Sequence, residues 1–430
     1  MTKNLCMAPW THTYLSPQTE RRLCCASREP AQSFTQYIDS AKGSNEYTPQ
    51  TLDEWWNGTT MRSVRKRMLK GQELPECQVC NTGELNTSVY RDYFKHLFGH
   101  KYNEILETTN DDGYTTMKPV SWDYRFSNLC NFKCRMCGPM LSSSWETEAR
   151  KEGKIEPWME TPVKKTIEKF QKDIVEQEFS DAVEEHRIEE IYWVGGEPLM
   201  YEQHWKYMQR IIELGDGPNL YARYNTNLSR VELNGVHLYK DILTNIRDWQ
   251  ICASLDGVGE VGEYIRTGLN YDQFIDNFKQ GLEIATSKRQ MRLDFTLTTP
   301  GLYQIQSIQN LAKELNCELL VKVCFAFTPD IAMSPLFLPK HLLHAIINNV
   351  LPITDGAMRD VLTNLLERKT FEEEFPSEVY LEARQRAKMR MESLDKGRNG
   401  IGFVDTLRNG NDPISEELIK WWNEIDTNNP

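Results

Sequence analysis

From about residue 120, short apolar runs alternate with longer stretches in which apolar residues recur at intervals of three and four. Six runs rich in apolar, aromatic and β-branched residues lie at 120–126, 188–194, 220–224, 249–255, 291–297 and 319–327. The stretches between them, such as 163–186, 202–214 and 271–286, have the periodicity of amphipathic helices. Strands that alternate with helices predict a parallel sheet, and six such units predict a partial, TIM-like (β/α)6 barrel of the α/β class.

The segments on either side of these six units have a different character. Residues 87–106 carry apolar residues at helical spacing and are followed by a polar stretch over 108–116. After residue 339 the pattern is helical, with lysine and arginine interleaved among glutamate. We therefore predict four segments, namely a cysteine-rich N-terminal domain (1–83), a helical linker (84–119), the barrel (120–338) and a helical C-terminal extension (339–430).

The charge of the chain bears on its partners. The 430 residues include 50 basic and 62 acidic side chains, which gives a net charge of −12. This sign disfavours nucleic acid and anionic membranes, because both attract positively charged proteins. The apolar runs are shorter than the roughly 18 residues of a membrane-spanning helix, and the first residues lack the apolar core of a signal peptide. We expect a cytoplasmic protein.

The eleven cysteines are grouped along the chain. An odd number excludes complete pairing in disulfides, and in a reducing compartment clustered thiols are more often metal ligands than structural bridges. The groups are Cys6, Cys24, Cys25, Cys77 and Cys80, then Cys130, Cys134 and Cys137, then the scattered Cys252, Cys317 and Cys324. The simplest interpretation is two metal centres.

Cys130, Cys134 and Cys137 follow the first predicted barrel strand in the spacing Cys-x3-Cys-x2-Cys. In βα barrels the residues that carry out chemistry follow the carboxyl ends of the strands. Three thiolates on one loop can bind three corners of a cubane iron–sulfur cluster, and no fourth cysteine lies nearby. One iron would then keep an open position, which is typical of a cluster that binds and activates a ligand.

This motif resembles that of the radical S-adenosylmethionine (SAM) superfamily. The resemblance implies a radical SAM barrel with a [4Fe–4S] cluster whose open iron binds the amino and carboxylate groups of SAM. An electron from the cluster would cleave SAM to methionine and a 5′-deoxyadenosyl radical, which abstracts a hydrogen atom from the substrate. A reductant protein such as a flavodoxin or ferredoxin is then an expected partner. The alternative is a zinc-stabilised, non-enzymatic binding protein.

Four further segments are similar to SAM-contacting elements of this superfamily. Two glycines let a ligand approach the backbone closely, and a neighbouring carboxylate can accept hydrogen bonds from an ammonium group. By the resemblance, the segment Gly195, Gly196 and Glu197 before Pro198 meets the amino group of SAM. The residues expected near its ribose or methionine part are Asn225, Asn227 and Ser254. The guanidinium of Arg266 is expected to pair with its carboxylate.

The front cysteines resemble a twitch module, the shortened relative of the SPASM domain that binds an auxiliary iron–sulfur cluster. The implied ligands of a second [4Fe–4S] cluster are Cys6, Cys24, Cys77 and Cys80, with Cys25 as the alternative to Cys24. Four thiolates close every iron corner, so such a cluster would conduct electrons or shape a site. A four-cysteine zinc site is the alternative, because a Cys-x2-Cys pair with two distant partners also suits zinc.

Cys252 lies two residues before Ser254, so strand alternation places both side chains on one face. A thiol there could return a hydrogen atom to a substrate radical, or it could simply fill core volume. Relatives with twitch or SPASM modules imply a precursor peptide as substrate, modified by oxidation, epimerisation or cross-linking. The alternative within the superfamily is a dehydrogenase of a small sugar or alcohol.

Overall fold

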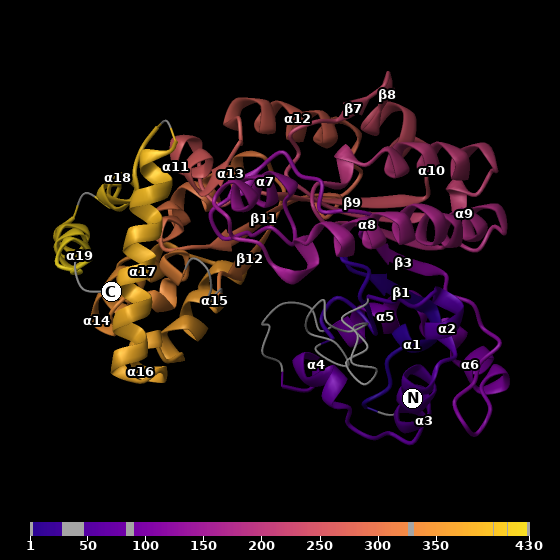
Figure 1. Cartoon of the computed structure of the whole chain (residues 1–430). Helices are drawn as coiled ribbons and strands as arrows, with labels where there is room; N and C mark the ends of the chain where they lie inside the picture. Colours follow the sequence, from indigo (N-terminus) through magenta and orange to yellow (C-terminus); the bar gives the residue numbers. More distant parts are fainter. Residues whose placement is uncertain are drawn as a thin grey trace. The chain divides into compact units, whose positions relative to one another are not determined.

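The computed structural model describes residues 3–27, 47–82, 90–325, 331–398, 400–410 and 412–427. The chain forms two compact units, each assembled from several stretches of sequence (Figure 1). The first unit comprises Met1–Cys130, Pro139–Asn225 and Val231–Gln250, and the second comprises Asn131–Gly138, Thr226–Arg230 and Ile251–Pro430. The cysteine loop therefore begins in the first unit and continues in the second.

The first unit contains a mostly parallel sheet in the order β6-β5-β3-β1-β2. The strands are β1 (His12–Leu15), β2 (Arg21–Arg22), β3 (Ser121–Tyr124), β5 (Glu190–Trp193) and β6 (Tyr221–Thr226). β1, β3, β5 and β6 pair in parallel, and β2 alone of these pairs antiparallel, with β1. A short β7 (Glu232–Leu233) and β8 (Val236–His237) form a separate antiparallel pair.

One face of this sheet is aromatic and packs against helices. Trp122 and Trp193 contact the ring of Phe179 edge to face, and His204 contacts the ring of Trp193. The helices of the unit's barrel part are α7 (Ser143–Lys151), α8 (Thr161–Phe170), α9 (Glu176–Glu184) and α10 (Glu202–Glu213). Burial of this aromatic layer is a major favourable term in the folding of the unit.

The other face of the same sheet is polar and is covered from the N-terminal segment. His12 Nδ1 lies 2.7 Å from Ser121 Oγ, and Ser121 in turn donates to Glu190. The hydroxyl of Tyr93, on α5 (Tyr90–Phe98), donates to Glu190 at 2.9 Å. The other described helices of this segment are α1 (Ala8–Thr11), α2 (Leu52–Trp56), α3 (Thr59–Leu69), α4 (Gln78–Thr82) and α6 (Tyr102–Thr108).

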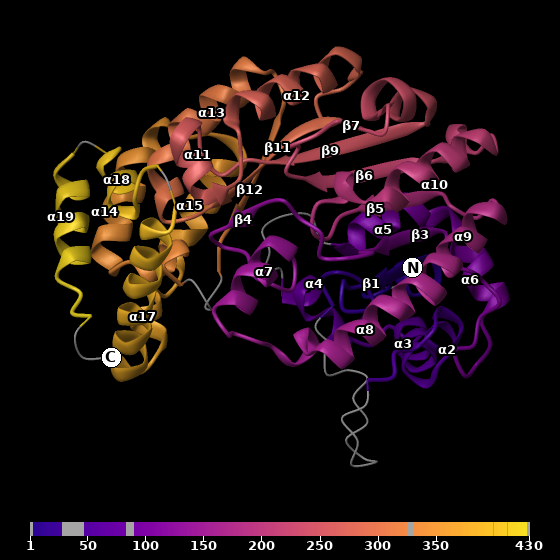
Figure 2. The ribbon, with the colours of Figure 1, turned by 45° about the horizontal axis from the view of Figure 1, so that its top comes forward.

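The second unit contains three parallel strands in the order β9-β11-β12. They are β9 (Asp248–Ser254), which starts in the first unit, β11 (Met291–Leu297) and β12 (Glu318–Val323). The helices α11 (Gly259–Ile265), α12 (Tyr271–Ile284) and α13 (Ile305–Glu314) alternate with them. The chain then continues as α14 (Lys340–Val350), α15 (Gly356–Glu367), α16 (Phe371–Glu374), α17 (Ser377–Lys396), α18 (Phe403–Arg408) and α19 (Pro413–Asn423), coloured orange to yellow in Figure 2.

The α/β fold class and the mostly parallel sheet are confirmed, and each of the six predicted strands is present. The predicted helix over 163–186 is divided by a π-helical turn at Gln171–Val175. The predicted strand over 319–327 ends at Val323, and residues 326 and 327, like residues 84–89 of the predicted linker, lie outside the described residues. The parallel pairing of β1 with β3 was not predicted. The four-segment division stays a prediction.

Among the described residues, no helix combines the length and the apolar composition needed to cross a membrane.

Candidate functional site

The backbone of Cys130 is held by the first residues of α7. The amide of Cys130 donates to Ser143 Oγ at 3.1 Å, and its carbonyl accepts from Ser144 Oγ at 2.8 Å. Ser142 caps the helix by accepting a hydrogen bond from the amide of Trp145. The serine side chains at the start of α7 therefore fix the position of Cys130, the residue at which the chain leaves the first unit.

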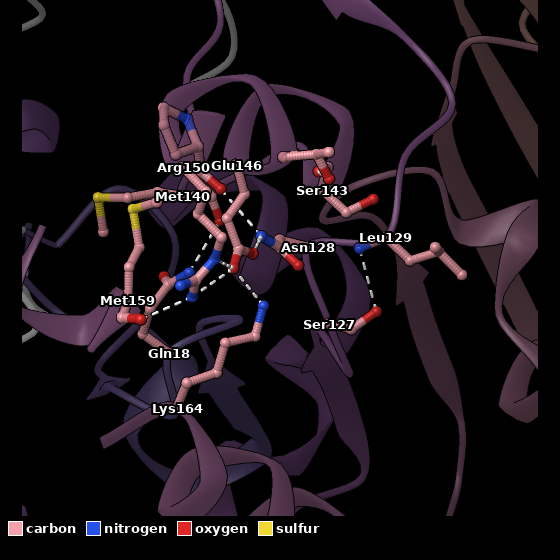
Figure 3. A network of polar contacts seen from close by, with 12 residues as sticks. Gln18, Ser127, Asn128, Leu129, Met140, Ser143, Glu146, Arg150, Met159 and Lys164 are labelled. Carbon is pink, nitrogen blue, oxygen red and sulfur yellow. Dashed lines mark hydrogen bonds and ion pairs between the residues drawn. The ribbon is translucent and has the colours of Figure 1, made fainter. Parts of the chain in front are cut away.

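The side chain of Asn128, which lies just before the cysteine loop, binds residues that lie just after the loop (Figure 3). Asn128 Nδ2 donates to the carbonyl of Pro139, where the chain re-enters the unit, and to Glu146, each at 2.9 Å. Glu146 is buried and also accepts from Arg150 and Lys164. Burial alone would raise the pKa of Glu146, but these hydrogen bonds outweigh it and lower the pKa, so the carboxylate stays charged.

The Gly-Gly-Glu segment after β5 lies directly against the residues that lead from β3 to Cys130. The amide of Glu197 donates to the carbonyl of Leu129 at 2.7 Å. A Cβ atom added to Gly196 would come within 2.3 Å of that carbonyl oxygen, so the close approach requires glycine. Glu197 is buried, and its Oε1 caps the turn Pro198–Met200 by accepting from the amide of Leu199 at 3.1 Å.

A tyrosine that the motif did not indicate completes this contact. The hydroxyl of Tyr201 donates to the carbonyl of Ser127 at 2.6 Å and accepts from the amide of Gly196 at 2.7 Å. Gly195 has φ +133°, and a Cβ there would lie 2.6 Å from the same hydroxyl. Both glycines are thus required by the packing of this turn against the segment that leads to Cys130. No local pattern marked Tyr201, because its partners are backbone atoms and one of them, the carbonyl of Ser127, lies 74 residues away in the sequence.

In the second unit, Cys134 lies on β4 (Lys133–Cys134), which pairs antiparallel with β10 (Arg266–Thr267). Arg266 is the residue opposite Cys134, and its Nη1 lies 3.9 Å from the thiol sulfur. The amide of Cys137 donates to the carbonyl of Cys134 at 3.0 Å, which closes a turn. The structure thereby brings together Cys134, Cys137 and Arg266, three of the residues singled out from the sequence.

The environment of these two thiols fits an iron cluster. Burial raises the pKa of Cys134 to about 12, and the Arg266 guanidinium only partly offsets this. Burial also raises the pKa of Cys137, again against the effect of Arg266. Thiols in such surroundings ionise when a metal ion supplies positive charge, and the thiolate is the form that ligates iron.

The guanidinium of Arg266 has a second partner. Its Nε lies 2.7 Å from Oδ2 of Asp256, a fully buried carboxylate. The other oxygen of Asp256 accepts from the amide of Thr296 at 2.8 Å. Asp256 therefore fixes the orientation of Arg266 beside Cys134. The sequence offered only Asp256-Gly257 after a strand, a pattern that is also typical of a simple turn.

The asparagine and serine candidates lie at strand ends. Asn227 Nδ2 donates to Asn131 Oδ1 at 3.0 Å, which ties the β6 end of the second unit to the residue after Cys130. Asn225 is half-buried on β6 in the first unit. Ser254 is the half-buried last residue of β9 and is in register with Asp294 of β11. A role of these three side chains in SAM binding stays a prediction.

Cys252 is fully buried and belongs to a charged cluster on one face of β9, β11 and β12. Arg292 donates to Cys252 Sγ at 3.0 Å and to Asp294 at 2.7 Å. Lys322 donates to the other oxygen of Asp294 at 2.8 Å. The two cations outweigh the effect of burial and lower the pKa of Asp294. The signal in the sequence was the alternation of Arg292 and Asp294 within an otherwise apolar strand.

Four front cysteines line one pocket of the first unit. They are Cys6, Cys24, Cys77 and Cys80, which share the pocket with apolar residues and with Glu76, Tyr90 and Arg91. Burial raises the pKa of Cys6 to about 12 and that of Cys77 to about 11, so here too the thiols need a metal to ionise. All eleven cysteines are free thiols. Within the described part of the chain, no three His, Cys, Asp or Glu side chains are arranged to hold a single metal ion.

Cys25 lies outside this pocket. Its thiol is hydrogen-bonded to Tyr90, and the charged groups near it are Asp123, Arg125 and Arg223. The two neighbouring cysteines thus point to different surroundings. Of the pair, Cys24 is the residue that the structure places with Cys6, Cys77 and Cys80.

The three-cysteine loop follows β3 of an α/β fold, and the segment before its first cysteine packs against the Gly-Gly-Glu turn after β5. Residues 124–303 match the model of the radical SAM superfamily. Residues 124–303 of the chain therefore form a radical SAM domain.

Solved structures were also compared. The chain is similar to "Native anSMEcpe with bound AdoMet and Cp18Cys peptide", with 15% identity and a TM-score of 0.35, over 57% of this chain and 61% of that one. It is similar to Streptococcus suis SuiB bound to S-adenosylmethionine, with 15% identity and a TM-score of 0.34, over 73% of this chain and 66% of that one. The chain thus matches less than two thirds of either solved protein. No curated protein matches the sequence.

Proposed function

We propose that the protein cleaves SAM reductively and abstracts a hydrogen atom from its substrate, with Cys130, Cys134 and Cys137 as the ligands of the catalytic [4Fe–4S] cluster. The observation that carries this is the turn that holds Cys134 and Cys137 beside Arg266. The chemistry supplied by the bound cluster and SAM is one-electron cleavage to methionine and a 5′-deoxyadenosyl radical. The protein supplies three thiolates, and the positive charge of Arg266 stabilises the one at Cys134.

The residues around the loop have separate proposed roles. Glu197 accepts hydrogen bonds from the amino group of SAM, since its carboxylate is fixed at the end of β5 by the amide of Leu199. Asp256 orients Arg266, whose remaining donors serve the SAM carboxylate. Because Gly195 and Gly196 have no side chain, the backbone of this turn can lie close to SAM. Gly196 lies close to the carbonyl of Leu129 for the same reason. Asn225, Asn227 and Ser254 are the proposed contacts of its ribose or methionine part.

Reductive cleavage of SAM by the anaerobically reconstituted protein tests this function. With dithionite as reductant, we expect wild type and Cys317→Ala to form 5′-deoxyadenosine, and Cys134→Ala to form none. Cys317 is the matched control because it belongs to neither proposed cluster site and its thiol donates to the backbone carbonyl of Ala312 on α13, at 3.8 Å. Equal 5′-deoxyadenosine from Cys134→Ala would disprove the ligand assignment. Zinc in place of iron in the wild type would favour the binding-protein alternative.

We also propose an auxiliary [4Fe–4S] cluster in a twitch-like N-terminal module, ligated by Cys6, Cys24, Cys77 and Cys80. The support is the convergence of these four thiols on one pocket. Four thiolates leave no open iron, so this cluster would transfer electrons and would not bind SAM.

For the substrate we propose a peptide, which is oxidised, epimerised or cross-linked. The resemblance of the front cysteines to peptide-modifying relatives supports this class over a small sugar or alcohol. Cys252 is a candidate hydrogen donor, since Arg292 holds its sulfur on the polar face of β9. A flavodoxin or ferredoxin is the proposed reductant. The test is mass spectrometry of a short peptide encoded beside this gene after incubation with enzyme, SAM and reductant, where an unchanged mass and unchanged α-carbon configuration would exclude it as substrate.

A further inference from the structure

Arg135, between the two cluster cysteines of the second unit, points away from them and is almost fully buried. Its Nε donates to the carbonyl of Tyr264 at 3.0 Å, and its guanidinium carbon lies 3.7 Å from the centre of the Tyr264 ring. Its amide donates to the carbonyl of Ile265 at 2.8 Å. The residue therefore binds the end of α11 through both its backbone and its side chain.

The remaining partner of Arg135 comes from the C-terminal segment. Nη2 lies 2.7 Å from Oδ1 of Asp395, on the last turn of α17, and Nη1 lies 3.9 Å from Met391 Sδ one turn earlier. Oδ2 of Asp395 accepts from the amide of Phe403 at 2.7 Å, at the start of α18. Asp395 thus connects the cysteine turn to two helices of the extension.

A second contact joins the same two regions. Arg398 Nη1 donates to Thr267 Oγ1 at 2.9 Å, on β10 next to Arg266. The β4–β10 pair that carries Cys134 has only two residues in each strand. An isolated pair of that length is not stable by itself, so the geometry of the cysteine turn depends on what packs behind it.

We propose that α17 positions the Cys134–Cys137 turn through the Arg135–Asp395 ion pair, and that the C-terminal extension thereby sets the stability and electronic properties of the catalytic cluster. Arg135 is a positioning residue, since it contacts neither thiol. The inference rests on the proposed function for the presence of the cluster. It adds a role for the C-terminal helices, in which the sequence showed no chemistry.

The buried ion pair explains why the effect should be large. Asp395→Asn leaves the buried guanidinium of Arg135 without its charged partner, and we expect the backbone around it to move to restore hydration. The turn that moves is the one that carries both thiols. An exposed charge pair on the same helix, such as Arg386 with Glu382, has no such consequence.

The first experiment uses the metal-free full-length protein, so it does not depend on cluster chemistry. The rate of alkylation by iodoacetamide at Cys134 and Cys137 is measured by mass spectrometry, with Cys317 as the internal reference. We expect Asp395→Asn and Arg135→Met to increase the rate at Cys134 and Cys137 on the order of tenfold, as expected for loss of a charged hydrogen bond. We expect Arg386→Met to leave the rate unchanged and Arg135→Lys to restore part of the protection.

The second experiment uses the reconstituted protein. The EPR spectrum of the reduced cluster is recorded with and without SAM, together with its midpoint potential and the iron content. We expect Asp395→Asn to shift the midpoint potential and to reduce the change that SAM causes in the EPR spectrum. Arg386→Met should match wild type in both. Circular dichroism checks that each variant is folded.

The possible results separate the two proposals. If alkylation rates, the SAM-dependent spectrum and the potential all match wild type in Asp395→Asn and Arg135→Met, the positioning role is wrong, even if thermal stability falls. If wild type binds no iron but the variants still expose Cys134 and Cys137, the link to α17 stands and the proposed function fails.

Discussion

The Nε atom of Arg266 lies 2.7 Å from the Oδ2 atom of Asp256. Both groups are largely removed from solvent, and the second oxygen of Asp256 is bound to the amide of Thr296. The position of the guanidinium beside Cys134 is therefore determined by a residue that lies two positions after the end of β9. An arginine that is already oriented loses less conformational entropy when it binds a carboxylate.

Asp256→Asn removes the charge that holds Arg266. Because the unpaired guanidinium stays buried, we expect the free energy of unfolding to fall by about 3 to 5 kcal/mol. Asp272→Asn, an exposed position at the start of α12, is the control and should change it by less than about 0.5 kcal/mol. Urea denaturation of the metal-free protein measures both. Equal midpoints for wild type and Asp256→Asn would show that the pair does not stabilise the fold.

Gly196→Ala tests the contact between the Gly-Gly-Glu turn and the approach to Cys130. The new methyl group would lie 2.3 Å from the carbonyl oxygen of Leu129, so the loop must move and we expect loss of about four irons per chain. Gly138→Ala adds the same group next to Cys137, where nothing lies within 4 Å, and should retain its iron. Iron and sulfide analysis after reconstitution distinguishes the two. Full iron content in Gly196→Ala would contradict the requirement for glycine.

The parts of the fold and site that could be predicted are those with local signals. The strands β3, β5, β6, β9, β11 and β12 are short runs rich in apolar, aromatic and β-branched residues, and the cysteine and glycine motifs occupy a few consecutive residues after two of them. Strand β1 has only four residues, all of them buried, and its partner β3 follows more than a hundred residues later. Neither its length nor its pattern distinguished it from a loop.

The same reasoning explains which site residues were missed. Tyr201 acts on backbone atoms, and Arg135 is paired with Asp395, 260 positions away in the chain. A single sequence contains no signal for such contacts, because each side chain alone is typical of a surface position. Cys24 and Cys25 are adjacent and of the same type, so only the folded backbone separates their surroundings.

Substitution of these two cysteines one at a time tests the auxiliary site. Cys24→Ser should reduce the iron content of the reconstituted protein from about eight to about four per chain, since one of four ligands is lost. Cys25→Ser should retain about eight, because Cys25 is not one of the residues that line the pocket and the charged groups near its thiol are Asp123, Arg125 and Arg223. Iron analysis and the EPR spectrum of the remaining cluster give the result. If Cys25→Ser falls to about four irons and Cys24→Ser keeps about eight, Cys25 is the ligand. If wild type itself contains only about four irons, the proposal of an auxiliary cluster is wrong.

The stability of the first unit should depend on pH through His204. This side chain is fully buried among the rings of Trp193 and Trp205, with Nε2 at 3.1 Å from the hydroxyl of Tyr224. Burial lowers the pKa of His204 to about 3, whereas an unfolded histidine titrates near 6.5. Below pH 6.5 the unfolded state therefore binds a proton that the folded state does not. The stabilising contribution is complete above that pH and is lost progressively toward pH 3.

His204→Gln removes the titration and keeps a polar side chain near Tyr224. Between pH 7 and pH 5 we expect wild type to lose about 2 kcal/mol more of its unfolding free energy than this variant does. His186→Gln, at an exposed position, should retain the pH dependence of wild type. Urea denaturation of the metal-free protein at both pH values measures the difference. The comparison with wild type isolates His204, because His12, whose pKa is also lowered to about 3 by burial, contributes equally to both proteins. A wild type and a His204→Gln variant with the same pH dependence would show that His204 takes up its proton without unfolding of the aromatic layer.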